Sequence, residues 1–234
     1  MMETSQDQSW WQQPRIITIV VDNDSWILPF AGRLAETIRE NGDTASLVRT
    51  HDDVPQGVAA FYLGCTKKTP PDVLRRNRFN LVVHESALPE GRGFAPLFWS
   101  VLMDAERVET CLLEAEDEVD AGPVYFRKSI HLDGTELNAD LRKLQADVTV
   151  DLCLEFLDSA QPPAATPQTG TATFHRRRTP KDSRLDVDRT IRDQFNLLRI
   201  VDNERFPAYF EFRGRRYRLA IHDDGPATEN PSET

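Results

Sequence analysis

Residues 81–96 have the sequence LVVHESALPEGRGFAP, in which an apolar run ends at His84 and a loop rich in Pro and Gly follows. Downstream, residues 118–123 read EVDAGP and place Asp120 before a turn of small residues. A histidine has an unperturbed pKa of about 6.5 and exchanges protons near neutral pH, and a nearby carboxylate can fix its tautomer and raise its basicity. His84 and Asp120 are therefore the candidate acid–base pair of this chain.

The apolar run before His84 is one of several that alternate with helical patterns. Residues 16–21 form a β-branched run without polar interruption, which is typical of a parallel strand buried on both faces. The remaining pattern predicts strands at 45–48, 58–63, 81–84, 110–115 and 124–130, and helices from Phe30 to Asn41 and at 70–76, 97–102 and 135–157. This alternation predicts an α/β fold with a mostly parallel sheet and right-handed crossovers.

The chain divides into five predicted parts: a flexible N-terminus (1–14), a main domain (15–160), a linker (161–170), a small α+β C-terminal segment (171–222) and a disordered tail (223–234). The linker is rich in Pro, Ala and Thr, which suits neither a helix nor a central strand. The C-terminal segment has a helical pattern at 191–201 and a hairpin pattern at 209–219. Such a small segment is expected to pack on the main domain.

The charge balance limits the kinds of partner. The chain carries 28 Lys and Arg against 38 Asp and Glu, a formal net charge of −10, which argues against general binding to nucleic acid or anionic membranes. No basic and apolar leader precedes residue 15 and no apolar run approaches the roughly 20 residues that span a bilayer, so we expect a soluble cytoplasmic protein. Cys65, Cys111 and Cys153 lie far apart without C-x-x-C spacing, so we expect neither disulfides nor a zinc site, and no metal.

The motifs around His84 and Asp120 resemble those of the folate-dependent formyltransferases. Residues 88–93, LPEGRG, look like that family's L-P-x-x-x-G turn, and residues 119–123, VDAGP, look like its D-x-G-x element. The resemblance covers roughly residues 15–220. It implies a Rossmann-like catalytic domain, N10-formyltetrahydrofolate as cosubstrate, and catalytic roles for His84 and Asp120.

The chain departs from the family pattern at one position. The family has an Asn two residues before the His, where it helps to hold the formyl oxygen, and this chain has Val82. Asn80 lies one strand repeat earlier on the same face, about 7 Å farther from the His. Two explanations stay open: another donor, such as a backbone N–H, Glu85 or Ser86, fills the role, or the protein is a weakened or inactive relative.

The resemblance also implies two sets of binding residues. Residues expected to contact the folate are Val82, Val83, Ser86, Leu88, Pro89, Gly91, Gly93, Glu116 and Glu118. Residues expected to contact the acceptor are Asn23, Ser25, Trp26, Lys67, Arg92 and Arg199. Lys67 follows a predicted strand at the edge where open α/β sheets bind ligands, so it is a candidate diphosphate contact or an ordinary surface charge. Arg92 is expected either to bind phosphate or to brace its loop.

The C-terminal segment bears on the acceptor. Residues 177–186, 195–201 and 206–210 resemble elements that follow the catalytic domain in nucleotide-sugar N-formyltransferases, commonly homodimers of surface-polysaccharide biosynthesis. Residues 22–26, DNDSW, together with Val82, look like a branch tied to pseudaminic acid. The implied acceptor is a UDP-linked 4-amino sugar, with dTDP- or GDP-linked amino sugars as alternatives.

Three other interpretations stay open. One is a noncatalytic relative that binds folate or a nucleotide, which Val82 motivates. Another is a methionyl-tRNA-type formyltransferase, against which the acidic charge argues. The third is an unrelated flavodoxin-like or Rossmann module, disfavoured because residues 22–25 are DNDS rather than a Gly-rich phosphate loop.

Overall fold

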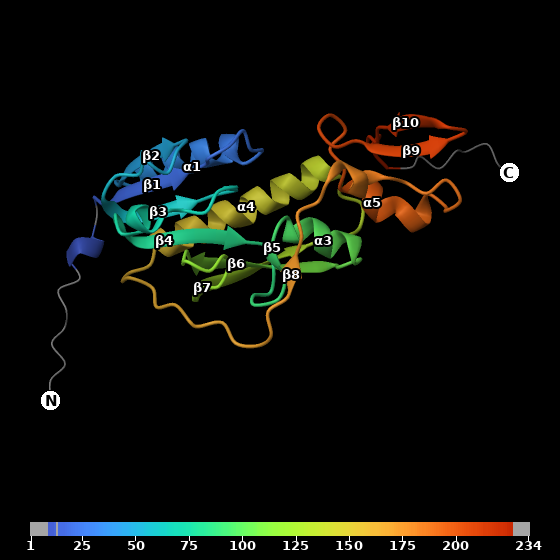
Figure 1. The fold of residues 1–234 in the computed structure, drawn as a ribbon. Helices are drawn as coiled ribbons and strands as arrows, with labels where there is room; N and C mark the ends of the chain where they lie inside the picture. The colour runs from blue at the N-terminus through green and yellow to red at the C-terminus, as the bar shows by residue number, and fades with distance from the viewer. Residues whose placement is uncertain (1–8, 13, 227–234) are drawn as a thin grey trace.

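A six-stranded mixed sheet forms the centre of the fold (Figure 1). The computed structural model describes residues 9–12 and 14–226. Its strands are β1 (Ile16–Val20), β2 (Thr44–Val48), β3 (Gly57–Tyr62), β4 (Asn77–His84), β6 (Arg107–Glu114) and β7 (Val124–His131), in the order β2-β1-β3-β4-β6-β7. The first four strands of the chain pair in parallel, whereas β6 is antiparallel to both β4 and β7. The expected α/β fold with a mostly parallel sheet is confirmed, and in this sheet the antiparallel pairings are those of β6 with β4 and with β7.

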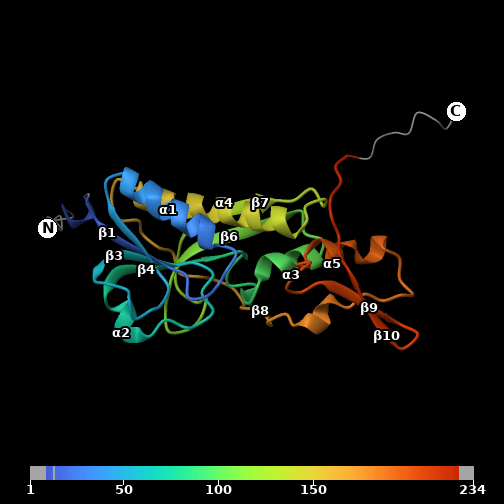
Figure 2. The same cartoon turned by 90° about the horizontal axis from the view of Figure 1, so that it is seen from above.

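Helices α1 (Leu28–Glu40) and α4 (Asn138–Leu157) lie side by side along one face of the sheet, and the short α2 (Pro71–Leu74) lies on the other side (Figure 2). Helix α1 ends at Asn41 and Gly42, and the φ of +99° at Gly42 is a backbone conformation that glycine adopts without strain. Helix α3 (Pro96–Leu102) follows the two-residue strand β5 (Arg92–Gly93).

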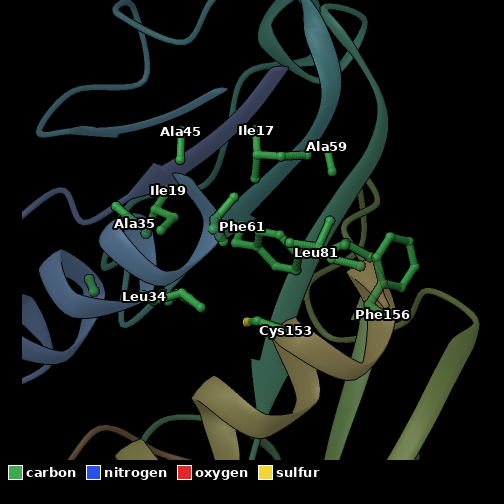
Figure 3. Packing of buried hydrophobic residues seen from close by; sticks show 14 of the residues in the cluster. Ile17, Ile19, Leu34, Ala35, Ala45, Ala59, Phe61, Leu81, Cys153 and Phe156 are labelled. Atoms are coloured by element: carbon green, nitrogen blue, oxygen red, sulfur yellow. The ribbon is translucent and has the colours of Figure 1, made fainter. Parts of the chain in front are cut away.

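The main core fills the space between the sheet and the α1–α4 layer. Figure 3 shows side chains of β1, β3 and β4 meeting those of both helices, with Phe61, Leu81 and Phe156 among them. Phe156 is fully buried and its ring contacts that of Phe61 edge-on at 6.2 Å. The burial of these large apolar side chains supplies the main stabilisation of the fold and fixes the sheet that carries the site.

The ordered chain begins before Arg15. Residues Ser9–Trp11 form a 3-10 turn, Trp11 is only 3% exposed, and its indole N–H donates a hydrogen bond of 2.7 Å to the Ser159 carbonyl. The expectation of a flexible segment 1–14 is therefore wrong for residues 9–11, because Trp11 covers the end of the core beside Phe156. Residues 1–8 and 13 of that segment lie outside the described residues.

The expected linker packs against the main domain. Thr166 pairs with Val124 through backbone hydrogen bonds in both directions, and strand β8 (Phe174–His175) then pairs in parallel with β5. Figure 1 shows this segment running along the sheet and returning to the loop around β5. Residues 161–175 thus pack against the main domain and reach the Pro/Gly-rich loop through the pairing of β8 with β5.

The C-terminal segment contains two 3-10 turns, η2 (Pro180–Ser183) and η3 (Arg192–Gln194), helix α5 (Phe195–Arg199) and the hairpin β9 (Ala208–Phe212) and β10 (Arg215–Leu219). The expected helix at 191–201 is thus split into a 3-10 turn and a shorter α-helix. Residues 227–234 of the expected tail lie outside the described residues, and residues 223–226 contain no helix or strand. Within the described part of the chain, no helix combines the length and apolarity needed to cross a bilayer.

Candidate active site

His84 is the last residue of β4, at the carboxyl end of the parallel part of the sheet, and it is 5% exposed. Its Nε2 lies 2.9 Å from the Gly91 carbonyl oxygen. Because a carbonyl only accepts hydrogen bonds, Nε2 carries the proton in this arrangement, and Nδ1 of a neutral ring is left as the acceptor.

Asp120 lies in the turn after β6 and faces the other ring nitrogen. Its Oδ1 is 3.6 Å from His84 Nδ1, and its Oδ2 accepts a 2.9 Å hydrogen bond from the Gly93 N–H. Both side chains are nearly buried, at 6% and 9% exposed. The loop at 88–93 therefore fixes both members of the pair, His84 through Gly91 and Asp120 through Gly93.

Glycine is required in this loop by close backbone approach. Gly93 has a φ of +103°, and a Cβ atom there would lie 2.4 Å from the His175 carbonyl oxygen. Gly91 has a φ of +72°, and its N–H donates to the Thr173 hydroxyl at 2.8 Å. These contacts hold the loop against the β8 segment, so the site depends on residues more than 80 positions downstream of β5.

The residues expected to contact folate surround this pair on three segments. Val82 and Val83 are half-buried at the end of β4; Leu88 and Pro89 are buried in the loop that follows, where the Leu88–Pro89 peptide is cis. Glu116 and Glu118 are exposed on the turn that carries Asp120. The three segments meet at His84.

Arg92 braces the loop instead of facing solvent. It is 8% exposed, and its guanidinium donates to Glu118 at 2.7 Å and to Gln168 at 3.0 Å. Gln168 in turn donates to the carbonyls of Asp120 and Gly122, both at 2.8 Å. Of the two roles expected for Arg92, the structure supports bracing, because its two terminal guanidinium nitrogens are committed to the turn that holds Asp120.

Val82 occupies the position of the family's Asn, and its side chain has no hydrogen-bond donor. Asn80 does not replace that Asn. The Asn80 amide donates to the Leu74 carbonyl at 2.8 Å and accepts from the Tyr62 hydroxyl at 3.2 Å. Glu85 is likewise engaged, because Gln145 donates to it at 2.6 Å. The Ser86 hydroxyl is buried and has no hydrogen-bond partner among the described residues.

The loops after β1 and β3 are tied together at the same sheet edge. The Asp22 carboxylate accepts from the backbone N–H groups of Thr66 and Lys67, both at 2.9 Å, and the Asn23 amide donates to the Gly64 carbonyl at 2.8 Å. The Lys67 side chain is exposed, whereas the neighbouring Lys68 forms a 3.0 Å ion pair with Asp117. Lys67 thus remains a cation at the ligand edge of the sheet.

Trp26, in the loop after β1, lies against the guanidinium of the partly buried Arg142. The Arg142 guanidinium lies between the Trp26 and Phe98 rings, 4.6 and 4.2 Å from their centroids, and burial lowers its pKa to about 10. Arg142 also donates to Gln145, the residue that holds Glu85. The sequence pattern did not single out Arg142, because its place on the apolar side of α4 has no spacing signal.

His175 is a second imidazole near the site. Its ring stacks on Trp99 with centroids 5.6 Å apart, and its Nε2 would lie 3.2 Å from a Cβ atom at Gly91. Burial lowers the pKa of His175, and the neighbouring His84 lowers it further. The sequence analysis missed this residue, because only the pairing of β8 with β5 brings it to the loop.

Arg199 holds the C-terminal segment in place. It is 3% exposed and forms a 2.7 Å ion pair with Glu136, while its Nε donates to the Glu136 carbonyl at 3.0 Å. A third contact joins it to Asn196 at 3.3 Å. These bonds fix α5 against the turn before α4, and the expected contact of Arg199 with the acceptor stays a prediction.

No protein-family model matches the chain. Over 155 residues it is 30% identical to the methionyl-tRNA formyltransferase of Streptococcus gordonii, an alignment that covers 64% of this chain and 49% of that protein. The chain spans about half the length of the curated relatives it matches.

Solved structures share the fold. The methionyl-tRNA formyltransferase from Clostridium thermocellum matches with a TM-score of 0.74 and 19% identity, covering 88% of this chain and 91% of that one. The chain thus resembles methionyl-tRNA formyltransferases in part of its sequence and in its fold. A sugar N-formyltransferase from a Shewanella species matches with a TM-score of 0.61 and 15% identity, covering 91% and 99% of the two chains. HypX from Aquifex aeolicus in complex with tetrahydrofolic acid matches with a TM-score of 0.67 and 16% identity, covering 89% and 38%.

The two motifs that carry the resemblance to formyltransferases are in direct contact. Residues 88–93 and 119–123 are far apart in sequence and meet through the Gly93 N–H and the Asp120 carboxylate. The turn is closed from behind by Gly122, where a Cβ atom would lie 1.9 Å from the Glu114 carbonyl oxygen. The family-like residues thus form one compact unit at the end of β4.

Proposed function

We propose that the protein transfers a formyl group from N10-formyltetrahydrofolate to the amino group of a nucleotide-linked amino sugar, with a UDP-linked 4-amino sugar favoured and a dTDP-linked sugar next. The observation that carries this proposal is the buried His84–Asp120 pair held by the 88–93 loop. This geometry suits a reaction that moves a proton away from an attacking amine.

The reaction needs a base close to the amine. The amine nitrogen attacks the formyl carbon, a C–N bond forms, and collapse of the tetrahedral intermediate breaks the bond to folate N10, which takes up a proton. His84 Nδ1 and Asp120 Oδ1 are two acceptors 3.6 Å apart, a separation that one amine nitrogen can bridge with hydrogen bonds of about 2.9 Å. A proton that passes to His84 is then stabilised by Asp120 on one side and by the Gly91 carbonyl on the other.

The tetrahedral intermediate also needs a donor for its oxyanion. Ser86 is our candidate, because its hydroxyl is buried near His84 and has no partner among the described residues. Its Cβ lies 3.0 Å from the position that a Cβ atom would take at Gly91, on the same loop that holds His84. A free hydroxyl beside the base fits the role that the family's Asn has at the position of Val82.

The donor assignment is supported by the relatives. The related HypX structure contains tetrahydrofolic acid, and the segments around Val82, Leu88 and Glu118 converge on His84 here. We infer that the folate lies against these segments with its formyl group directed to His84.

The sugar acceptor is supported by charge and by the loop at the sheet edge. A net charge of −10 opposes the grip on many phosphates that tRNA binding requires. The exposed Lys67 offers a single local cation, which suits a diphosphate at the ligand edge of the sheet. Asn23, Ser25 and Trp26 line the neighbouring loop.

A methionyl-tRNA acceptor is the second candidate, favoured by the 30% identity to tRNA enzymes. One experiment separates the two. The protein is incubated with N10-formyltetrahydrofolate and, in turn, with UDP-, dTDP- and GDP-linked amino sugars and with methionyl-tRNA, and the products are analysed by mass spectrometry. We expect the mass gain of one formyl group on a nucleotide sugar. Formylation of methionyl-tRNA alone would replace the acceptor proposed here, and folate binding without any product would favour a noncatalytic binder.

A further inference from the structure

Three potential metal ligands meet at the carboxyl ends of three adjacent strands of the sheet. Asp22 follows β1, His51 follows β2 and Cys65 follows β3, and in the sheet these strands lie in the order β2-β1-β3. The ligand atoms of the three side chains all lie within 4.8 Å of one another. The spacing of the cysteines gave no sign of this cluster. The three ligands come from separate loops, which only the folded sheet brings together.

His51 provides an independent sign of a ligand. The residue is 9% exposed, and its Nε2 has no hydrogen-bond partner among the described residues. This nitrogen lies 3.9 Å from Asp22 Oδ2, and the ring is held edge-on against Tyr62 with centroids 5.8 Å apart. A buried, unpartnered polar atom is costly, and an ion that binds it would remove that cost.

The other two ligands are held ready. The Asp22 carboxylate is 2% exposed and is oriented by the N–H groups of Thr66 and Lys67. The Cys65 thiol makes a weak 3.4 Å hydrogen bond to the Val20 carbonyl. Burial raises the pKa of Cys65 to about 12, but a coordinated cation deprotonates a thiol outright.

We propose that Asp22, His51 and Cys65 bind a divalent ion of the zinc type through one oxygen, one nitrogen and one sulfur atom. Zinc bonds of about 2.0–2.3 Å place tetrahedral ligands roughly 3.3–3.7 Å apart. The 3.9 Å between His51 Nε2 and Asp22 Oδ2 therefore needs only a small closure, and separations of up to 4.8 Å within the cluster need a closure of about 1 Å. Three protein ligands leave a fourth position for water or a bound molecule.

The local charges favour a cation. The Asp22 and Asp52 carboxylates both act electrostatically on His51, and the Lys67 ammonium opposes them. Lys67 is exposed, so its side chain can turn to solvent when an ion binds. None of the contacts that these three side chains make with other described residues involves His84 or Asp120, so this inference does not depend on formyl transfer.

The test is a titration of the full chain with Co²⁺ after treatment with a chelator. Binding is monitored by the near-ultraviolet charge-transfer absorption of a thiolate–cobalt bond. Competition with Zn²⁺ then measures the affinity for zinc. We expect one equivalent to bind. Cys65→Ser should remove the absorption band and weaken binding more than about tenfold, and His51→Gln should weaken binding similarly while keeping the thiol.

Cys111→Ser is the matched control, because this thiol is buried outside the cluster and donates to the Ser86 carbonyl. The control should bind as the parent does, and circular dichroism should show that all variants fold. An absence of binding by the parent would overturn the proposal. Parent-like binding by Cys65→Ser or His51→Gln, or equal loss in Cys111→Ser, would also overturn it.

Discussion

At the scale of single residues, Ser86 is the side chain whose role is most open to test. Its buried hydroxyl lacks a partner among the described residues. If it donates to the oxyanion, Ser86→Ala should lower kcat by about 10²–10³-fold, which is the typical loss for one oxyanion donor. The dissociation constant for folate should change little, since the substitution removes no bond that the structure shows for the free hydroxyl.

Ser100→Ala is the control for Ser86→Ala. The Ser100 hydroxyl donates to the Pro96 carbonyl one turn earlier in its own helix, at 3.1 Å, so its removal should leave kcat near the parent value. Steady-state rates with saturating folate decide between the outcomes. A Ser86→Ala enzyme as fast as the parent would mean that another group holds the oxyanion.

Sequence motifs predicted which residues lie close together, but they did not reveal the intramolecular partners of the arginines. The sequence indicated that His84 and Asp120 belong together, and the structure places them 3.6 Å apart. It also assigned Arg92 and Arg199 to substrates, and their structural roles were not foreseen: Arg92 donates to Glu118 and Gln168, and Arg199 pairs with Glu136. Those partners lie 26 to 76 residues away, and no local pattern shows such pairings.

At the scale of elements, the pairing of β5 with β8 is what holds the loop at the site. Gly93→Ala would place a Cβ atom 2.4 Å from the His175 carbonyl oxygen at a φ of +103°. We expect this variant to lose about 1–3 kcal/mol in its free energy of unfolding. Hydrogen exchange should become faster at the Phe94 amide, which donates to His175.

Gly214→Ala separates backbone strain from this steric contact. Gly214 has a φ of +75° in the β9–β10 turn, and no atom lies within 4 Å of a Cβ atom placed there. Urea unfolding should show a smaller loss for Gly214→Ala than for Gly93→Ala. Equal losses would show that the β5–β8 contact adds nothing to the stability.

Glu114, at the end of β6, has a partly buried carboxylate whose pKa predicts a pH effect on stability. Burial raises the pKa of Glu114 above its usual value of about 4.3, although the Asn80 N–H and the Tyr125 hydroxyl donate to it. The folded state therefore binds this proton more tightly than the unfolded state. Its contribution to stability is full below the unfolded pKa and is lost as the pH rises through the folded pKa.

Glu114→Gln should remove this pH dependence. The amide keeps an oxygen for the Asn80 N–H and carries no charge to desolvate, so the variant should gain stability relative to the parent as the pH rises from about 4 to about 8. Urea unfolding across that range measures the difference. Glu40→Gln is the control, because Glu40 is exposed at the end of α1 and does not act on Glu114. A Glu114→Gln difference that stays constant with pH would contradict the account.

Element-level prediction worked for strands and helices because hydrophobic periodicity reports local burial. All six sheet strands and α1, α3 and α4 lie where the pattern placed them, within a few residues. Strand direction depends on the path of the connections, which the hydrophobic pattern does not report. The pattern therefore did not predict that β6 pairs antiparallel with β4 and β7. Trp11 was assigned to a flexible segment, because its partner Ser159 is 148 residues away.

At the scale of the whole molecule, the C-terminal hairpin exposes apolar side chains. Phe212 on β9 and Tyr217 and Leu219 on β10 are 49%, 43% and 37% exposed. We expect this hairpin to form a homodimer interface, since such clustered exposure is typical of protein contacts. Sedimentation velocity should show a dimer for the parent and a monomer for Phe212→Glu.

Ile191→Glu is the control for the hairpin substitution. Ile191 is 71% exposed and lies outside the hairpin, so its replacement should leave the dimer intact. A monomeric parent, or a dimer that Phe212→Glu leaves unchanged, would refute this interface.

The account centres on the claim that the His84–Asp120 pair moves the proton in formyl transfer. The most direct measurement is the initial rate at which formylated product forms from N10-formyltetrahydrofolate and the acceptor identified by mass spectrometry. The parent, His84→Asn and Asp120→Asn are compared once melting temperatures have shown that both variants are as stably folded as the parent. The account predicts that each substitution lowers the rate by about 10²–10⁴-fold. A rate unchanged from the parent in either folded variant would contradict it.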